Sequence, residues 1–335
     1  MYEGTLSRPM SDDADRGQLL VIVGLIIAVS FIGLAVALNA AIFSENLSTR
    51  ESVDAEEAAA YTAGVEPAIG DAYDETNDGG AATAADARTE LGDLLGEWET
   101  AREREAAREG ADFGLNRTAH VGWRLEQDAN RSFTPEGNAS ATDWTVADGV
   151  QNISAFELNV NRTKLYDNAN ASAFRLNVSN GTTHWKLYIY QDSANGEINV
   201  SEGNPTDPSS ENCSLTADRA VIDFRDETLR NETLAGGDCS ALDFSSAVSG
   251  PLVIRYENVQ NGGSERVNGT YRIVVNGSDA VATDGSDEPK RFNTSGASAP
   301  TATAVVYAVS YDSHYRRNDV VHDREGRYAP RAEAY

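Results

Sequence analysis

The pattern of hydrophobic and polar residues sets an apolar N-terminal segment apart from the rest of the chain. Residues 19–38 form an almost purely apolar run of 20 residues, and no charged residue occurs from Gly17 to Ser44. At about 1.5 Å rise per residue, a helix of this length crosses a hydrocarbon core of about 30 Å. The run therefore predicts a transmembrane helix. Good helix formers continue to about Ala60, so we expect transmembrane helix and stalk over residues 18–62.

A break and a second helix follow in the pattern. Gly and Pro residues interrupt it between 64 and 70, and residues 71–80 are typical of an acidic loop. A capping-box-like start at Thr83 and a stop after Glu109 then predict an amphipathic helix. Its apolar stripe, which we expect to pack on the head, consists of Ala87, Leu91, Leu94, Leu95, Trp98 and Ala101. Residues 63–112 form this loop-and-helix unit.

From about residue 113 the pattern changes to a period of two, which is typical of half-buried strands. Apolar residues alternate over 174–178 and 185–189, on either side of the hairpin signal Asn180-Gly181. Further strands are predicted at 221–224, 252–256, 271–275 and 304–311. Strands without intervening helices indicate an antiparallel β-sandwich-like head over residues 113–311. The predicted fold class is therefore α+β.

Composition adds a strong negative charge to this outline. The 335 residues include 27 Lys and Arg against 53 Asp and Glu, a formal net charge of −26, and only three of the cationic residues are lysines. Such a charge repels phosphate backbones and predicts no nucleic acid partner. Acidic, lysine-poor surfaces suit concentrated salt, because screening removes the self-repulsion that loosens a fold. We interpret the chain as halophilic, with an ordinary acidic secreted protein as the alternative.

The last segment, residues 312–335, departs from this imbalance. It carries five arginines and five acidic residues and is therefore neutral. Such a terminus can dock on an acidic neighbour, but mixed-charge chain ends are more often solvated. We expect a solvated tail.

A short motif precedes the apolar run. Residues 15–18, with the sequence DRGQ, end a charged leader and open directly into the run. This arrangement resembles the class III signal peptides of archaeal pilins and archaellins, in which a dedicated peptidase cuts before the apolar stretch. With residues 39–50 (NAAIFSENLSTR), the match is similar to haloarchaeal pilin-like membrane-anchored proteins. The resemblance implies a leader of residues 1–17, cleavage between Gly17 and Gln18, and a β-sandwich head on an N-terminal helix.

Two features of the apolar helix bear on assembly. Bacterial-type pilins usually have a Glu at the fifth mature position, whereas this position is Ile22 here, so docking through that carboxylate is not predicted. Small residues nevertheless recur at four-residue spacing, which would let neighbouring helices approach closely. These helix-packing candidates are Gly24, Ala28, Gly33, Ala37 and Ala41.

Two other uses of the N-terminal segment stay open. One is an uncleaved single-span anchor, and the other is an ordinary secretory signal with a small-residue cleavage site at residues 35–37. Arg8 and Arg16 precede the run and only Arg50 follows it closely. The positive-inside rule then predicts a single-pass protein of the cell membrane with its C-terminal head extracellular.

Acceptor triplets for N-glycosylation agree with an extracellular head. Fifteen of the 24 asparagines begin an N-x-S/T triplet, where about four would be expected by chance. The triplets predict a glycoprotein, and the alternative is that Asn, Ser and Thr simply co-occur in β-turns. The candidate glycosylation sites are Asn116, Asn138, Asn180, Asn268 and Asn276.

The chain has two cysteines, Cys213 and Cys239. Two thiols cannot complete a four-ligand zinc site, and their separation is not that of a C-x-x-C motif. An oxidising exterior predicts one disulfide between them, with two buried free thiols as the alternative.

Motifs for catalysis do not occur in the sequence. There is no H-E-x-x-H metal pair, no G-x-S-x-G elbow and no phosphate-binding G-x-x-x-x-G-K-[ST] loop. His314 and His322 could share a metal by their spacing, but no cysteine or ordered acidic partner accompanies them. We therefore predict no enzyme, no cofactor and no metal site.

Together these features predict a pilin-like cell-surface structural protein, a minor subunit of a type IV pilus-like assembly in adhesion or secretion. Its partners would be the membrane and, through the apolar helix, other pilin-like subunits. A monomeric membrane-anchored surface-binding module is the alternative. An anchored extracellular hydrolase is a third and weaker hypothesis, because carboxylates are too numerous for any one pair to be informative.

Overall fold

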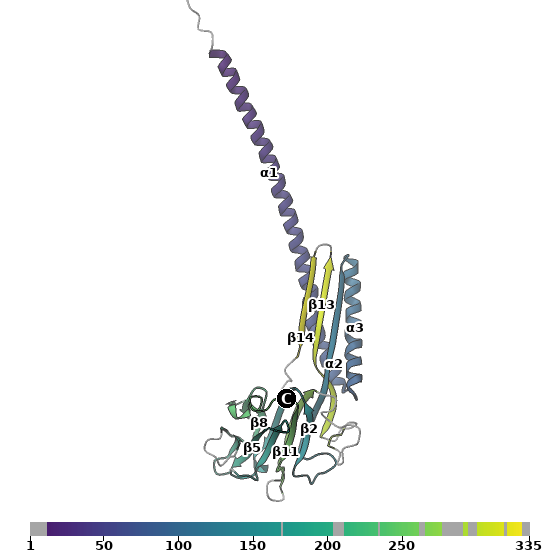
Figure 1. The fold of residues 1–335 in the computed structure, drawn as a ribbon, viewed down its shortest axis with the longest axis vertical. Coiled ribbons are helices and arrows are strands. Elements are labelled where there is room, and N and C mark those ends of the chain that lie inside the picture. Colours follow the sequence, from purple (N-terminus) through teal and green to yellow (C-terminus); the bar gives the residue numbers. More distant parts are fainter. Residues whose placement is uncertain are drawn as a thin grey trace, which may run out of the picture.

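The computed structural model has an elongated shape, with a long N-terminal helix leading to a β-rich head (Figure 1). The described residues are 12–168, 170–203, 211–233, 235–260, 265–276, 291–293, 300–317 and 320–329, and for 12–21 and 43–57 only the backbone is described. Most of the predicted leader, residues 1–11, lies outside them. The α+β class, the apolar N-terminal helix and the mostly antiparallel head are confirmed.

Helix α1 (Asp12–Ala63) runs without a break through the apolar run and the predicted stalk. Its span Ile22–Ile42 is long and apolar enough to cross a membrane. Every side chain of this span is exposed, so no described part of the head covers it. Ala58 and Tyr61, in contrast, are buried against the head. The helix therefore projects its apolar part away from the head and seats its last turns in it (Figure 1).

The acidic loop predicted for residues 71–80 was wrong, because this stretch belongs to a helix. Helix α2 (Val65–Gly79) follows directly after Gly64. Pro67 does not prevent it, since an N–H in the first turn has no intrahelical acceptor to lose. The buried face consists of Val65, Ile69, Gly70, Ala72, Thr76 and Asn77, whereas the acidic residues are exposed. The prediction of a loop was based on the acidic residues of the solvent face and did not recognise the helical spacing of the buried residues.

Helix α3 (Ala84–Arg108) begins after Thr83, the residue at which the sequence places a cap. Thr83 Oγ1 accepts a hydrogen bond from the Asp86 N–H at 3.1 Å, which satisfies one of the free donors of the first turn. Of the apolar stripe, Ala87, Leu91 and Leu95 are buried, Leu94 and Trp98 are half-buried and Ala101 is exposed. The helix packs along α2 and the first half of the long strand that follows it.

The described strands form two antiparallel sheets. The large sheet has the order β10-β9-β8-β3-β12-β1-β13-β14. Its strands are β1 (Asp112–Ser132), β3 (Ile153–Asn161), β8 (Arg219–Asp223), β9 (Thr228–Arg230), β10 (Gly236–Asp238), β12 (Asn268–Asn276), β13 (Thr301–Arg317) and β14 (Val320–Tyr328). The small sheet has the order β2-β11-β4-β5-β6-β7. Its strands are β2 (Trp144–Val150), β4 (Phe174–Ser179), β5 (His184–Asp192), β6 (Glu197–Glu202), β7 (Asn212–Thr216) and β11 (Leu252–Glu257). Two short 3-10 turns, η1 (Arg162–Lys164) and η2 (Ser240–Leu242), complete the described elements.

One face of each sheet is apolar, and the two apolar faces share a core. Tyr256 on β11 packs against Tyr271 on β12, with ring centroids 5.6 Å apart, and so joins the small sheet to the large one. The predicted hairpin is present between β4 and β5, with Gly181 at a φ of +88°. Because strand side chains alternate between faces, the remaining face of the large sheet is polar and turned away from the core. We call it the outer face.

Beyond the sandwich, the large sheet continues as a narrower region toward α1. We call this region the neck; it comprises α2, α3, residues 58–63 of α1 and strand residues 112–120, 309–317 and 320–328. Tyr61 of α1 packs on Tyr315 and Phe113, with ring centroids 5.0 and 6.2 Å away. The helices cover one face of these three strands, as Figure 1 shows.

The expected solvated tail is part of the fold through residue 328. Residues 312–317 complete β13, and β14 pairs with them in antiparallel register. Arg324 on β14 donates to Glu66 on α2 at 2.8 Å, and Val320 packs partly against the core. Arg324 thus faces the neck helices at a position where a strand pattern would predict an apolar residue, and this strand was missed.

Candidate functional site: a charged groove on the large sheet

The residues singled out in the N-terminal helix lie far from the head. Gly17 and Gln18 occupy the second turn of α1, where the backbone alone is described. The helix-packing candidates from Gly24 to Ala41 are exposed, and a Cβ placed on Gly24 or Gly33 would meet no atom within 4 Å. This surface of α1 is therefore open to a partner outside the head.

A clamp of aromatic and charged side chains fixes the end of α1 to the neck. The Tyr61 hydroxyl donates to Glu109 Oε2 at 2.9 Å. The Arg102 guanidinium lies 5.5 Å from the Tyr61 ring and 5.6 Å from the Trp98 ring, in reach of both π faces. Burial, together with the hydrogen bond to Glu109, raises the pKa of Tyr61, so the phenol keeps its proton. The clamp sets the direction in which α1 leaves the head.

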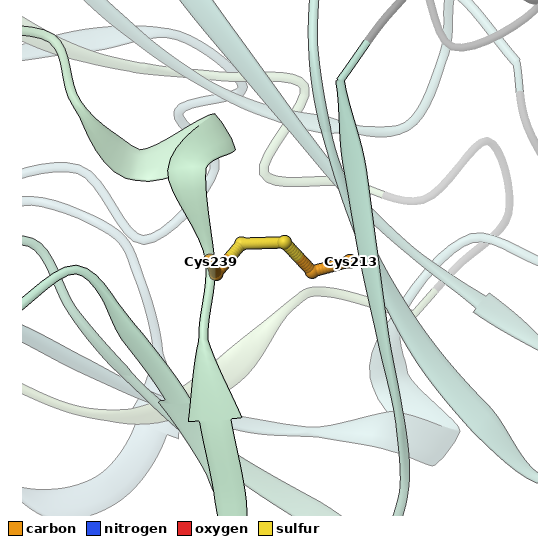
Figure 2. Close-up of a disulfide and its surroundings, with 2 residues drawn as sticks. All are labelled: Cys213 and Cys239. Carbon is orange, nitrogen blue, oxygen red and sulfur yellow. A yellow bond between two sulfur atoms is a disulfide. The ribbon is translucent and has the colours of Figure 1, made fainter.

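The cysteines close one side of the sandwich. Cys213 lies on β7, at one edge of the small sheet, and Cys239 follows β10, at one edge of the large sheet. Figure 2 shows the disulfide between them, with an S–S distance of 2.06 Å. The bond therefore joins the edge strand of the small sheet to the residue that directly follows the edge strand of the large sheet.

The candidate glycosylation sites differ in exposure. Asn116, on β1, is exposed. Asn138, Asn180, Asn268 and Asn276 are half-buried. The Asn180 amide nitrogen also donates to the Ser249 carbonyl at 2.9 Å, a bond that ties down the atom that a glycan would use. Asn116 is therefore the most accessible of the five.

The two histidines that could share a metal by their spacing point to opposite faces of the sheet. His314 lies against Gly114 on the outer face, whereas His322 stands opposite Tyr315, whose side chain is buried on the helix face. Within the described ranges, no three His, Cys, Asp or Glu side chains gather in a way that could hold a metal ion.

The clearest hollow of the head lies on the outer face of the large sheet. It has a volume of about 460 Å³ and crosses β1, β12, β3 and the end of β8. Glu126 pairs in register with Arg272, Arg272 with Glu157, and Glu157 with Asp223. Directly paired residues of neighbouring strands point to the same face, so these four side chains form one row across the groove.

Ion pairs tie the first half of this row together. Glu126 Oε2 lies 3.1 Å from Arg124 Nε, and Glu126 Oε1 lies 3.6 Å from Arg272 Nη2. All three side chains are about one-fifth to one-quarter exposed, so they are only partly screened by water. One carboxylate therefore holds two guanidinium groups in place.

The second half of the row crowds two acids around one arginine. Arg230 Nη2, from β9, lies 3.0 Å from Glu157 Oε2 and 3.8 Å from Asp223 Oδ2. Burial raises the pKa of Glu157; Arg230 opposes this shift and Asp223 adds to it. This part of the groove is thus partly desolvated, with Arg230 balancing the two carboxyl groups.

Small apolar residues lie beside the row. Ala155, Val274 and Val305 form a separate cluster on the outer face, with Tyr307 packed at its edge. Ala155 and Val274 are direct partners on β3 and β12, two residues along from Glu157 and Arg272 and therefore on the same face. All three residues of the cluster are buried, and Ala155 is the one that lines the groove next to its charged row.

Two turns form the walls of the groove. At one end Asp78 lines it from the last turn of α2, and Gly80 of the following turn lies beside Thr303 of β13. At the other end Arg225 and Asp226 line it from the turn after β8. Arg225 donates to the Ser154 carbonyl, which orients its side chain along the wall.

The sequence analysis did not identify the groove. Its residues are the polar members of alternating strands, and each strand alone looks like an ordinary solvated face. Only the strand order β8-β3-β12-β1 brings Glu126, Arg272, Glu157 and Asp223 into one row. The signal that could have found them is the repeated placement of Arg and Glu at outward positions of strands that are otherwise Val, Ile, Thr and Tyr.

Comparison with known proteins gives one match of limited extent. Residues 13–155 match the family model described as "Family of unknown function (DUF7261)". The match runs from α1 through both neck helices, β1 and β2 to the start of β3, so it covers the apolar span and one side of the groove. None of the curated proteins matches the chain.

Proposed function

We propose that the protein is a membrane-anchored cell-surface protein of the pilin-like type. The observation that carries this proposal is the division of α1: its span Ile22–Ile42 is apolar and wholly exposed, while Ala58 and Tyr61 of the same helix are buried in the neck. A helix exposed in this way needs an apolar solvent or other apolar helices around it. The bilayer, or the core of an assembly of such helices, would supply that environment.

The proposal places the head outside the cell. The disulfide at the sandwich edge suits an oxidising compartment. Asn116 offers an exposed acceptor triplet on the neck, and the net charge of −26 suits a salty exterior and disfavours nucleic acid. The leader before Gln18 would then remain on the cytoplasmic side until it is removed.

Processing is tested by the N-terminus of the mature chain. We expect protein extracted from membranes of a halophilic archaeal host to begin at Gln18, and to stay in the membrane fraction after alkaline extraction. Gly17→Val should leave the leader uncut, while Gly4→Val, a matched change in the same leader, should not. A mature chain that begins at Met1 contradicts the pilin-like interpretation and leaves the uncleaved anchor.

Assembly is tested at the small residues of α1. The native cysteines are joined to each other, so a single new cysteine in the span reports contacts between chains. Ala37→Cys should give disulfide-linked oligomers in membranes under mild oxidation. Val36→Cys, one residue away and rotated by about 100° around the helix, is the matched control. Equal cross-linking of both variants, or of neither, argues against packing through this face.

The groove favours a second candidate, a surface-binding module that acts as a monomer. Absence of oligomers in the Ala37→Cys experiment, with the protein retained in the membrane, would favour it. We propose no catalytic role, because Glu126 and Glu157 at the centre of the groove are each held by an arginine. Carboxyl groups held in this way are poor proton donors and poor bases toward a third group.

A further inference from the structure

We propose that the groove on the outer face of the large sheet binds a neutral oligosaccharide. The groove is defined by the row from Glu126 to Asp223, the floor at Ala155 and the walls at Asp78 and Arg225. The inference goes beyond the anchoring function proposed above. It uses the extracellular position of the head only to explain where such a ligand would be met.

The balance of charge in the groove disfavours an ionic ligand. Six acidic residues and three arginines line it, so an anion meets a net negative field. A cation would have to compete with Arg124 and Arg272 for Glu126, and with Arg230 for Glu157. Concentrated salt, which the composition suits, would screen either kind of ligand further. A ligand without charge avoids the repulsion, the competition with the arginines and the loss of binding by screening.

The same ion pairs make the groove a good partner for hydroxyl groups. A guanidinium carries five N–H donors and a carboxylate accepts at two oxygens, so each pair leaves donors and acceptors unused. Arg272 and Glu126 are partly exposed, and their pairing holds these groups in fixed directions. A sugar hydroxyl both donates and accepts, and adjacent hydroxyls can bridge neighbouring groups of the row. Binding of this kind depends on hydrogen bonds rather than on net charge.

The shape of the groove fits a short chain of sugar rings. Its volume of about 460 Å³ lies within the range of about 300–1,000 Å³ for small-ligand sites. Sugar rings have apolar C–H faces, and the small side chain of Ala155, which lines the groove, leaves room for one beside the charged row. The turns at Asp78 and Arg225 limit the length that can lie between them.

The test uses the full-length protein in detergent micelles and concentrated KCl. Its probes are a printed array of neutral oligosaccharides ending in glucose, galactose, mannose or N-acetylglucosamine, an oligogalacturonate as the acidic arm, and trilysine as the cationic arm. We expect binding to at least one neutral oligosaccharide, little changed between moderate and high salt. Binding only to oligogalacturonate, only to trilysine, or to none of the probes overturns the proposal. No step depends on cleavage of the leader or on assembly, so its failure is separate from failure of the anchoring function.

Variants of the groove locate the binding. Glu126→Gln removes the carboxylate that orients two arginines, and Arg225→Ala removes an exposed wall residue with little risk to the fold. Each should weaken binding about tenfold. Ala155→Phe should fill the floor of the groove and abolish binding. Glu325→Gln, on β14 of the same sheet but outside the groove, is the matched control and should bind normally. If Arg225→Ala and Ala155→Phe both bind as the control does, the ligand lies elsewhere and the proposal fails.

Discussion

At the residue scale, the side chain of Asn77 on helix α2 pairs with the backbone of a strand. Strand β13 is paired with β14 only from Val309 onward, and a bulge lies beside Val306. Asn77 Nδ2 donates to the Val306 carbonyl and Asn77 Oδ1 accepts from the Val306 N–H, each at 2.9 Å. The side-chain amide thus supplies the two bonds that a neighbouring strand would make. It also attaches the end of α2 to the sheet.

Replacement of Asn77 by alanine should be costly. Asn77→Ala leaves a buried N–H and a buried C=O of Val306 without partners, and each such group costs about 1–3 kcal/mol. We expect the free energy of unfolding, measured by urea denaturation in high salt, to fall by about 2–6 kcal/mol. Glu75→Ala, at an exposed position of the same helix, is the matched control. A similar loss in both variants would mean that the amide pairing contributes nothing specific.

His120 provides a second test at this scale, through pH. It lies on the outer face of the neck, with Nε2 2.8 Å from Ser310 Oγ and its ring 6.0 Å from that of Tyr307. Burial, helped by the charge of Arg327, lowers the pKa of His120. The unfolded chain therefore takes up this proton first as the pH falls, and the folded state loses stability from about pH 6.5 downward.

The change His120→Gln isolates this effect from the other titrations. The variant should lose less stability than the parent protein between pH 7.5 and pH 5, because glutamine has no proton to take up. Urea denaturation at the two pH values gives the difference directly. An unchanged pH dependence in His120→Gln would show that this ring does not contribute.

At the element scale, the sequence allows prediction wherever an element carries its own signal. The cap at Thr83, the turn at Asn180-Gly181 and the apolar run of α1 each depend on local chemistry, and each feature lies where the sequence places it. Helix α2 and strand β14 have charged solvent faces and are stabilised by contacts with each other and with β13, such as Arg324 with Glu66. These partners are distant in sequence, so the composition of each segment alone predicted an acidic loop and a solvated tail instead of a helix and a strand. The groove depends on strand order and could not be predicted for the same reason.

The disulfide yields a prediction about elements rather than single side chains. Residues 213–239 include β8 and β9 of the large sheet, so the bond closes a loop that crosses from one sheet to the other. Loop-closure arithmetic gives a stabilisation of about 3.5 kcal/mol for a loop of this length. The double variant Cys213→Ala/Cys239→Ala should unfold at a correspondingly lower urea concentration, with binding at the groove retained. Full stability in the double variant, or in the reduced parent protein, would contradict this estimate.

At the scale of the whole molecule, the charge is unevenly placed. The apolar span carries none, while α2 has five acidic residues and no basic one, and Glu66 of α2 pairs with Arg324 of β14. In the groove, by contrast, Glu126 and Glu157 are each paired with an arginine. Repulsion should therefore be concentrated on α2 and the neck rather than on the sandwich core.

Because of this uneven charge, low salt should destabilise the packing of α2 before that of the sandwich. At an ionic strength of about 0.01 M the screening length is about 30 Å, compared with about 3 Å at 1 M, so the acids of α2 repel one another and the rest of the −26 charge. We expect dialysis from concentrated KCl to reduce the helical circular dichroism first, as α2 separates from β13, and to end cooperative thermal unfolding afterwards. Sucrose at matched osmolality is the control, because it strengthens burial without screening charge. Recovery in KCl but not in sucrose would identify screening as the cause, whereas an unchanged spectrum in low salt would remove the argument that this fold is built for a saline exterior.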